Sequence, residues 1–189
     1  KPEQAYARGN QQMHSTTLGW RMVNPRHHDQ WTIALGEGAE ILADRYRISR
    51  EEQDEFAVAS HQRAAAAWAE GRFDAEVVPA YGAHLAQDEC VRADSSTESL
   101  ARLRLVFRDD GSDTAGNASP MNDAAAAMLI GTEAAAAAIG AEPLARIVSR
   151  AVSGVDPHLY GIGPVEAAQV ALDRAGIGWG DLDVVELNE

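Results

Sequence analysis

Lysine is almost absent from this chain of 189 residues: Lys1 is the only one, so nearly all of the 16 basic side chains are arginine. The 29 acidic side chains bring the net charge to −13. Nucleic acid is therefore disfavoured as the main partner, because phosphate backbones are bound by clustered basic residues. A small phosphate ligand stays open, because an arginine holds phosphate through two parallel hydrogen bonds.

Cysteine is equally scarce, and the single Cys90 excludes an internal disulfide and fits a reducing compartment. A nucleophilic cysteine needs a cationic setting, whereas Asp88 and Glu89 precede Cys90, so we interpret it as a loop cysteine. The six histidines show no HxxxH or HxH spacing, and no metal site is expected. No apolar run is long enough to span a bilayer and the first residues do not resemble a signal peptide, which favours the cytoplasm.

The first half of the chain is predicted to be a helical and irregular module with few strands. A helix is predicted from Gly36 to Tyr46, and a longer one follows Ser49, which forms a capping box with Glu52 and is closed by Gly71. We expect the inner face of the longer helix to carry Phe56, Ala59, Arg63, Ala67 and Trp68. A short helix is expected within 96–103.

The second half alternates strand-like and helical stretches. Residues 145–155 and 182–187 have the alternation or β-branched content of strands. Between them lie predicted helices, one capped by Thr132 and Gly140, the other with Pro164 at its start and Gly176 past its end. This order predicts a layered α/β fold after a boundary near residue 113.

Two glycine-containing stretches leave alternatives open. TAGNASPMND at 114–123 has small residues and braces (Asn117, Asn122, Asp123), so it either lays main chain along a ligand or simply turns before a core segment. GIGPVEAA at 161–168 lacks the third glycine of GxGxxG, which disfavours a dinucleotide oxidoreductase. Its helix start attracts an anion or is only a cap.

Four arginines lie within 17 residues, at positions 92, 102, 104 and 108. They either meet a phosphate group or form a solvated face, and the pattern alone does not decide between these.

Several long motifs occur together and in order. They are ISREEQDEFAVASHQRAAAAWAEGRFDAEVVP, DECVRADSSTESLARLRLVF, TAGNASPMNDAAAAMLIGTEAA, GVDPHLYGIGPVEAA and DLDVVELNE. Across essentially the whole chain they resemble the thiolase family, the acyl-CoA acetyltransferases, and the last resembles the start of that family's Asn-Glu-Ala-Phe motif.

The resemblance implies a thiolase-like layered αβαβα fold, here incomplete, with an inserted helical and irregular loop domain. Residues 1–113 would form the loop domain that covers coenzyme A. Residues 114–142 would return to the N-terminal half, and residues 143–189 would begin the C-terminal half.

The family's reaction is reversible transfer of an acyl group between a cysteine and coenzyme A, with Claisen formation or thiolytic cleavage of a carbon–carbon bond, as in fatty acid β-oxidation. Its catalytic cysteines and histidine have no counterpart in this sequence, and Cys90 matches neither cysteine. Only Asn188 matches the catalytic set, as the amide that fixes an oxyanion-hole water, with Glu189 in support. A neutral, oriented amide suits this role because it stabilises developing negative charge.

The resemblance also carries over positions that contact acyl-CoA. Those on the coenzyme side are Arg92, Ser99, Phe107, Ala115, Ser119 and Met121. Leu35 and Tyr160 match positions that line the acyl pocket. Coenzyme A and acyl-CoA are substrates here, with no tightly bound cofactor, and the core implies a homodimer or tetramer.

Some positions depart from the family's pattern. Ala34 precedes Leu35 where many thiolases have His before Met, Leu105 replaces a proline and Ala124 replaces a glycine. Asp113 stands where the family has a hydrophobic residue. The first hypothesis is thus a thiolase or part of one. The rival is a truncated, non-catalytic coenzyme A-binding or scaffold remnant, and the sequence flanking this segment discriminates between them.

Overall fold

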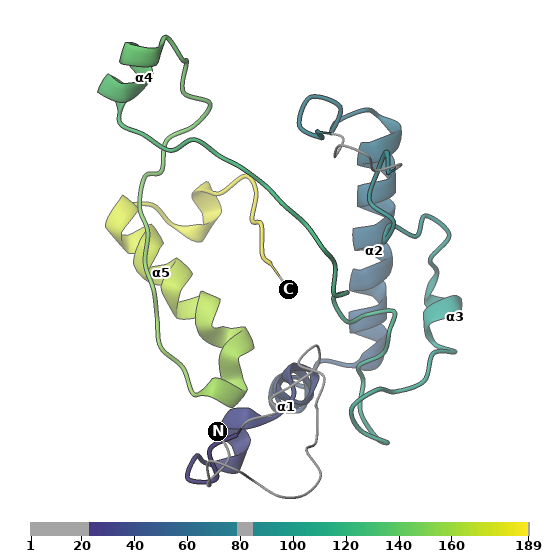
Figure 1. Ribbon diagram of the computed structural model, residues 1–189. Helices are drawn as coiled ribbons and strands as arrows, with labels where there is room; N and C mark the ends of the chain where they lie inside the picture. The colour runs from purple at the N-terminus through teal and green to yellow at the C-terminus, as the bar shows by residue number, and fades with distance from the viewer. Residues whose placement is uncertain (1–22, 79–84, 189) are drawn as a thin grey trace, which may run out of the picture.

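The structure is a computed structural model that describes residues 23–78 and 85–188. Helix α2 (Arg50–Ala69) stands on one side of the molecule and α5 (Gly163–Ala175) on the other, while α1 (Leu35–Tyr46) lies below and between them (Figure 1). Helix α1 packs against the 3-10 turn η2 (Pro157–Ile162), and η2 also packs against α5 and against η1 (Asp29–Thr32). These contacts connect the two sides of the chain through α1.

The ends of α2 follow from local sequence, as predicted. The Glu52 amide donates to Ser49 Oγ at 3.1 Å, and Glu52 Oε2 accepts from the Ser49 amide at 2.8 Å, which completes the capping box. Gly71 follows the helix with a φ of 69°, the left-handed conformation that glycine adopts without strain.

The shorter helices also lie where capping residues place them. Ser96 caps α3 (Thr97–Leu100), which is shorter than the predicted range, and Thr132 caps α4 (Glu133–Ile139). Gly140 and Gly176 end α4 and α5 in the left-handed conformation. Pro164 lies at the second position of α5, one residue further in than expected. The 3-10 turn η3 (Trp179–Asp181) follows α5.

The predicted inner face of α2 was wrong in part. Phe56 is 66% exposed and Arg63 is exposed, whereas the buried residues of α2 are Asp54 and Ala57. Helix α2 packs against α3, and its buried side meets the polar segment 112–117 rather than an apolar layer. Side chains buried against a polar neighbour must form hydrogen bonds with it, so the pattern of apolar residues did not identify the buried side of α2.

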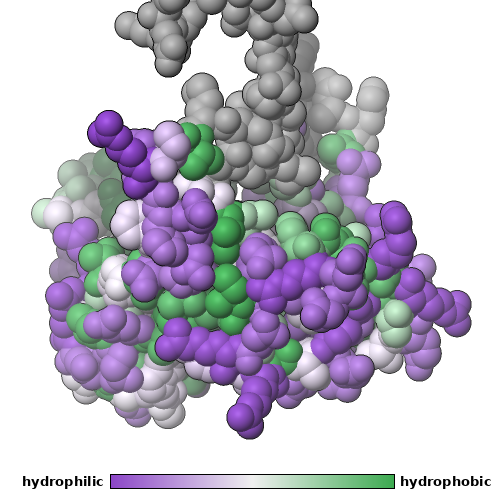
Figure 2. All heavy atoms as spheres, turned by 90° about the horizontal axis from the view of Figure 1, so that it is seen from below, coloured by the Kyte–Doolittle hydropathy of each residue, from purple (hydrophilic) through white to green (hydrophobic). Residues whose placement is uncertain are grey.

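The predicted strands are extended but unpaired in the part of the chain that the structure describes. There, the only bridge between extended segments joins Leu105 to Thr114. Segments 145–155 and 182–187 carry exposed apolar side chains, among them Val152 at 92%. Figure 2 shows apolar residues at the surface among hydrophilic ones. A strand needs hydrogen bonds from a neighbour, and the expected sheet layers are therefore not formed within residues 23–78 and 85–188.

Candidate functional site

Three residues predicted to contact acyl-CoA meet at the first turn of α1. The Tyr160 hydroxyl donates to the Leu35 carbonyl oxygen at 3.1 Å. The ring of Phe107 lies over Gly36, where an added Cβ would stand 1.9 Å from the ring. All three side chains remain partly exposed, so the structure brings Leu35, Phe107 and Tyr160 together at an accessible surface.

A buried carboxylate holds the segment that leads into the TAGN stretch. Glu40, on α1, is 2% exposed. It accepts hydrogen bonds from the Ser112 amide at 2.8 and 2.9 Å, from Ser112 Oγ at 2.9 Å and from the Asp113 amide at 2.8 Å. Because these donors lie in one short segment, a single side chain fixes the course of the backbone there.

A second buried carboxylate holds the other side of the same segment. Asp54, on α2, is 3% exposed and accepts from Arg50 Nε at 2.8 Å and from Asn117 Nδ2 at 3.0 Å. Asn117 also receives the Thr114 amide on its Oδ1 at 2.7 Å, and Thr114 is fully buried. The prediction that Asn117 braces this loop is confirmed.

We use the name acidic brace for Glu40 and Asp54 with the segment 112–117 that they hold. Sequence reasoning missed both carboxylates, although Glu40 stands between Ala39 and the apolar pair Ile41 and Leu42. The usable signal was the polar, small-residue segment itself, whose backbone amides must be satisfied by partners elsewhere.

Alanine at position 111 tests how firmly the acidic brace is held. A Cβ on Gly111 would lie 2.3 Å from Glu40 Oε1, an atom that two backbone amides fix in place. We therefore expect Gly111→Ala to lower the free energy of unfolding by about 2 kcal/mol, measured by chemical denaturation. Gly154→Ala is the control, because nothing lies within 4 Å of a Cβ at that position. Equal stability of the two variants would contradict the description.

Asp113 is buried within the acidic brace, at a position that resembles one where thiolases have a hydrophobic residue. Burial, and then repulsion from Glu40, raises the pKa of the Asp113 carboxyl from 3.8 to about 6. Burial, with the nearby Asp113 charge, also raises the pKa of Tyr160 above its ordinary value. The protonated, neutral form of Asp113 is thus the one that fits this site.

Stability should consequently fall as the pH rises from 4 to 7. The folded state keeps a proton on Asp113 that the unfolded chain has already lost, so this stabilisation is complete below pH 3.8 and disappears as the pH passes about 6. Asp113→Asn should remove roughly 1–2 kcal/mol of this decline, measured as the difference in unfolding free energy between the two pH values. Asp110→Asn, an exposed change in the same loop, should leave the decline as it is. A decline that is identical in the Asp113 variant would contradict the assignment.

Two of the four arginines at positions 92–108 differ in whether they form ion pairs. Arg108 pairs with Glu37 at 2.5 Å and with Asp44 at 2.7 Å, and these carboxylates raise its pKa. The guanidinium of Arg92, by contrast, makes no ion pair with any residue in 23–78 or 85–188. Of these two, Arg92 is the one whose cation is open to a phosphate.

The remaining predicted residues lie apart from the first turn of α1. The Ser99 hydroxyl completes the capping box of α3, since it accepts from the Ser96 amide and donates to the Ser96 carbonyl oxygen. Ala115 lies exposed within the acidic brace, and Ser119 and Met121 lie exposed in the segment that follows it, where Cys90 Sγ donates to Asn122 Oδ1 at 3.1 Å. Asn188 lies exposed at the end of the last extended segment, and Glu189 lies outside the described residues.

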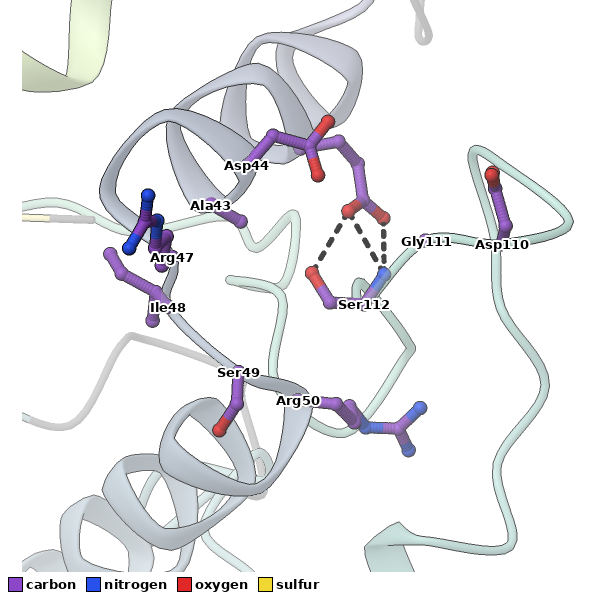
Figure 3. Close-up of a pocket in the computed structure, with 10 residues that line it drawn as sticks. Ala43, Asp44, Arg47, Ile48, Ser49, Arg50, Asp110, Gly111 and Ser112 are labelled. Atoms are coloured by element: carbon purple, nitrogen blue, oxygen red, sulfur yellow. Dashed lines mark hydrogen bonds between the residues drawn. The ribbon is translucent and has the colours of Figure 1, made fainter.

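An open pocket of about 410 Å³ borders the acidic brace, between the end of α1, the start of α2 and segment 110–112. Figure 3 shows Asp44 and Arg47 on the α1 side, Ser49 and Arg50 on the α2 side, and Ser112 with its hydrogen bonds. Its lining contains none of the predicted contact residues. We therefore interpret it as a surface hollow left by the brace.

Two family models match this chain in succession. The N-terminal domain of thiolases matches residues 3–134, and the C-terminal domain of thiolases matches residues 141–189.

The chain belongs to the thiolase family.

Individual relatives agree. A 3-oxoadipyl-CoA/3-oxo-5,6-dehydrosuberyl-CoA thiolase of Escherichia coli (strain K12) is 45% identical over 186 residues, which are 94% of this chain and 46% of the relative. An acetyl-CoA acetyltransferase of Pseudomonas aeruginosa is 50% identical over 177 residues, covering 90% of this chain and 43% of the relative. The crystal structure of the Bacillus anthracis acetyl-CoA acetyltransferase matches with a TM-score of 0.76 at 43% identity, over 85% of this chain and 41% of that one.

The likeness to this solved structure is consistent with a thiolase fold, and the chain spans about half the length of the curated relatives it matches. Within residues 23–78 and 85–188, no helix has the length and apolarity needed to cross a membrane. In the same residues, histidine, cysteine and carboxylate side chains form no group of three or more that would hold a metal ion.

Proposed function

We propose that this thiolase chain is part of an acyltransferase that cleaves or forms 3-ketoacyl-CoA through a cysteine-bound acyl intermediate. The consecutive match of both thiolase domains carries the proposal. The catalytic cysteines and histidine lie outside this segment in the proposal. Asn188 contributes the amide that fixes the oxyanion-hole water, with Glu189 in support.

The first turn of α1 would contact the acyl part of the substrate. Leu35 and Tyr160 supply the acyl-facing surface, and the hydrogen bond between them fixes their spacing. Phe107 packs on the same turn and would face the nucleotide end. The spacing between the acyl-facing and the nucleotide-facing residues would therefore be set by the first turn of α1, which both groups contact.

The coenzyme would lie along the acidic brace and the segments that flank it. Arg92 would hold a phosphate and Ser99 would lie beside the nucleotide, while the loop that bears Ala115, Ser119 and Met121 would carry the pantetheine arm. The acidic brace supports this proposal, because its hydrogen bonds tie segment 112–117 to both α1 and α2. Main chain that is fixed in this way can follow an extended ligand.

The wider assignments are parts of the same proposal. Residues 1–113 form the loop domain, 114–142 return to the N-terminal half and 143–189 begin the C-terminal half. The complete protein is cytoplasmic and forms a homodimer or tetramer through the thiolase core, which would cover the exposed apolar side chains at 145–155 and 182–187. It needs no tightly bound cofactor.

Turnover of defined thioesters tests the proposal. The complete protein should convert acetoacetyl-CoA and coenzyme A into acetyl-CoA, or act on 3-oxoadipyl-CoA, and the 189-residue segment alone should do neither. Product formation is followed by chromatography of the thioesters. Turnover by the isolated segment would refute the placement of the catalytic residues, and a complete protein inactive on all 3-ketoacyl-CoA substrates would refute the function.

The rival is a non-catalytic coenzyme A-binding or scaffold protein derived from a thiolase. The intact mass of the protein, or the coding sequence on both sides of this segment, separates the two. Flanking CxSG-like and GHP-like motifs support the enzyme, whereas a stop codon directly after Glu189 supports the remnant.

A further inference from the structure

The loop that carries Arg92 is attached to the middle of α2. His61, which is half-buried on that helix, receives the Arg92 backbone amide on its Nδ1 at 3.2 Å. The two residues are 31 positions apart, so this bond joins the loop to a rigid element and is not a local turn.

Both polar groups of the Arg92 backbone are engaged. Its amide donates to His61, and its carbonyl accepts from the Ser95 amide at 3.1 Å. The bond between Cys90 and Asn122 ties the same loop to the segment after the acidic brace. The main chain of Arg92 is thus fixed while its side chain stays exposed.

A fixed backbone with an exposed guanidinium suits an arginine that binds an anionic ligand. A guanidinium binds phosphate through two parallel N–H groups, and the cost of ordering it falls if the backbone beneath is already fixed. Other arginine side chains in the described residues form ion pairs with carboxylates, as Arg50 does with Asp54 and Arg108 does with Glu37. Arg92 differs from these arginines, because its backbone is fixed while its guanidinium pairs with no carboxylate in residues 23–78 or 85–188.

We propose that His61 is a positioning residue that holds Arg92 in place for the 3′-phosphate group of coenzyme A. The proposal rests on the function proposed above, and adds to it a residue on α2 that never touches the ligand. His61 must present a lone pair at Nδ1, so its ring proton belongs on Nε2. Any change that removes the acceptor at that point should loosen Arg92.

Side-chain geometry supplies a matched set of variants. In His61→Asn the amide oxygen takes the place of Nδ1, so the acceptor is retained. In His61→Gln the side chain is one carbon longer, and its amide lies nearer the former Nε2. His61→Ala removes the acceptor and much of the volume. A role confined to helix packing would not separate the Asn and Gln variants in this way.

The experiment measures KM and kcat of the complete protein for coenzyme A and for dephospho-coenzyme A, which lacks the 3′-phosphate. His61→Ala and His61→Gln should raise KM for coenzyme A about fivefold to tenfold, with kcat within twofold, and leave KM for dephospho-coenzyme A unchanged. His61→Asn should resemble the wild type. Arg92→Ala should give the same selective loss, and adding His61→Ala to it should change KM no further.

The outcomes separate the inference from the function on which it rests. A wild-type protein that neither binds nor turns over coenzyme A would overturn the proposed function, and this inference with it. A selective loss in Arg92→Ala without one in His61→Gln would overturn the positioning role alone. An equal loss for both forms of the coenzyme in the His61 variants, or no difference between the Asn and Gln variants, would do the same. If His61→Ala fails to fold, the comparison of Asn with Gln still decides.

Discussion

Glu40→Ala should lower the free energy of unfolding by about 3–5 kcal/mol, a large share of the stability of an ordinary domain. The change removes the acceptor of two backbone amides and one hydroxyl, all in the buried part of the acidic brace. Each donor that stays buried without a partner costs about 1–3 kcal/mol. Relief of the repulsion between Glu40 and Asp113 offsets only part of this loss.

Two further variants show whether hydrogen bonding is the cause. Glu40→Gln keeps an acceptor oxygen and the side-chain volume, so we expect a loss of about 1 kcal/mol. Glu55→Ala, an exposed change on α2, should stay within about 0.5 kcal/mol of the wild type. Urea unfolding followed by circular dichroism gives all three values. A Gln variant as unstable as the Ala variant would show that the charge, and not the acceptor, carries the stabilisation.

Asn188→Ala should reduce kcat of the complete protein by about 100- to 1000-fold if the proposed oxyanion-hole role is correct. The amide would hold the water that faces the thioester oxygen, and this contact matters most when the oxygen becomes negative. A loss that is confined to the transition state appears in kcat while KM for the acyl-CoA stays close to its original value.

Stability and a neighbouring substitution serve as controls for the Asn188 variant. The unfolding midpoint of Asn188→Ala, measured beside kcat, separates a loss of catalysis from a loss of folding. Asp183→Ala, which is exposed in the same segment, should retain wild-type kcat. Activity of the Asn188 variant within threefold of the wild type would remove this residue from the catalytic set.

Local signals in the sequence located the helices well. Capping side chains and terminal glycines act over a few residues, and Ser49, Thr132 and Gly176 lie where those rules put them. The buried side of α2 was less accessible to such rules, because Phe56 is exposed and Asp54 is buried. Which side of a helix is buried depends on its neighbour, and here that neighbour is a polar segment about 60 residues away.

The candidate site shows the same division. Resemblance to thiolases placed Leu35, Phe107 and Tyr160 among the substrate contacts, and the structure gathers them at one turn. Nothing local indicated that Glu40 would bind the segment at 112–113, or that His61 would hold the Arg92 amide. That these three residues contact substrate remains a prediction. The roles of the other site residues also remain predictions, namely those of Arg92, Ser99, Ala115, Ser119, Met121, Asn188 and Glu189. Strands at 145–155 and 182–187 likewise depend on pairing partners, which their own alternation does not specify.

The acidic brace also has a consequence for the order in which the chain folds. The capping box of α2 closes over three residues, whereas Glu40 reaches a segment 72 residues further along the chain. Closing so long a loop costs entropy before any contact repays it, so α2 can form early while the segment at 112–117 stays open. During synthesis, the Glu40 carboxylate on α1 therefore stays hydrated until the ribosome has made residues 112 and 113, whose amides it binds in the folded chain.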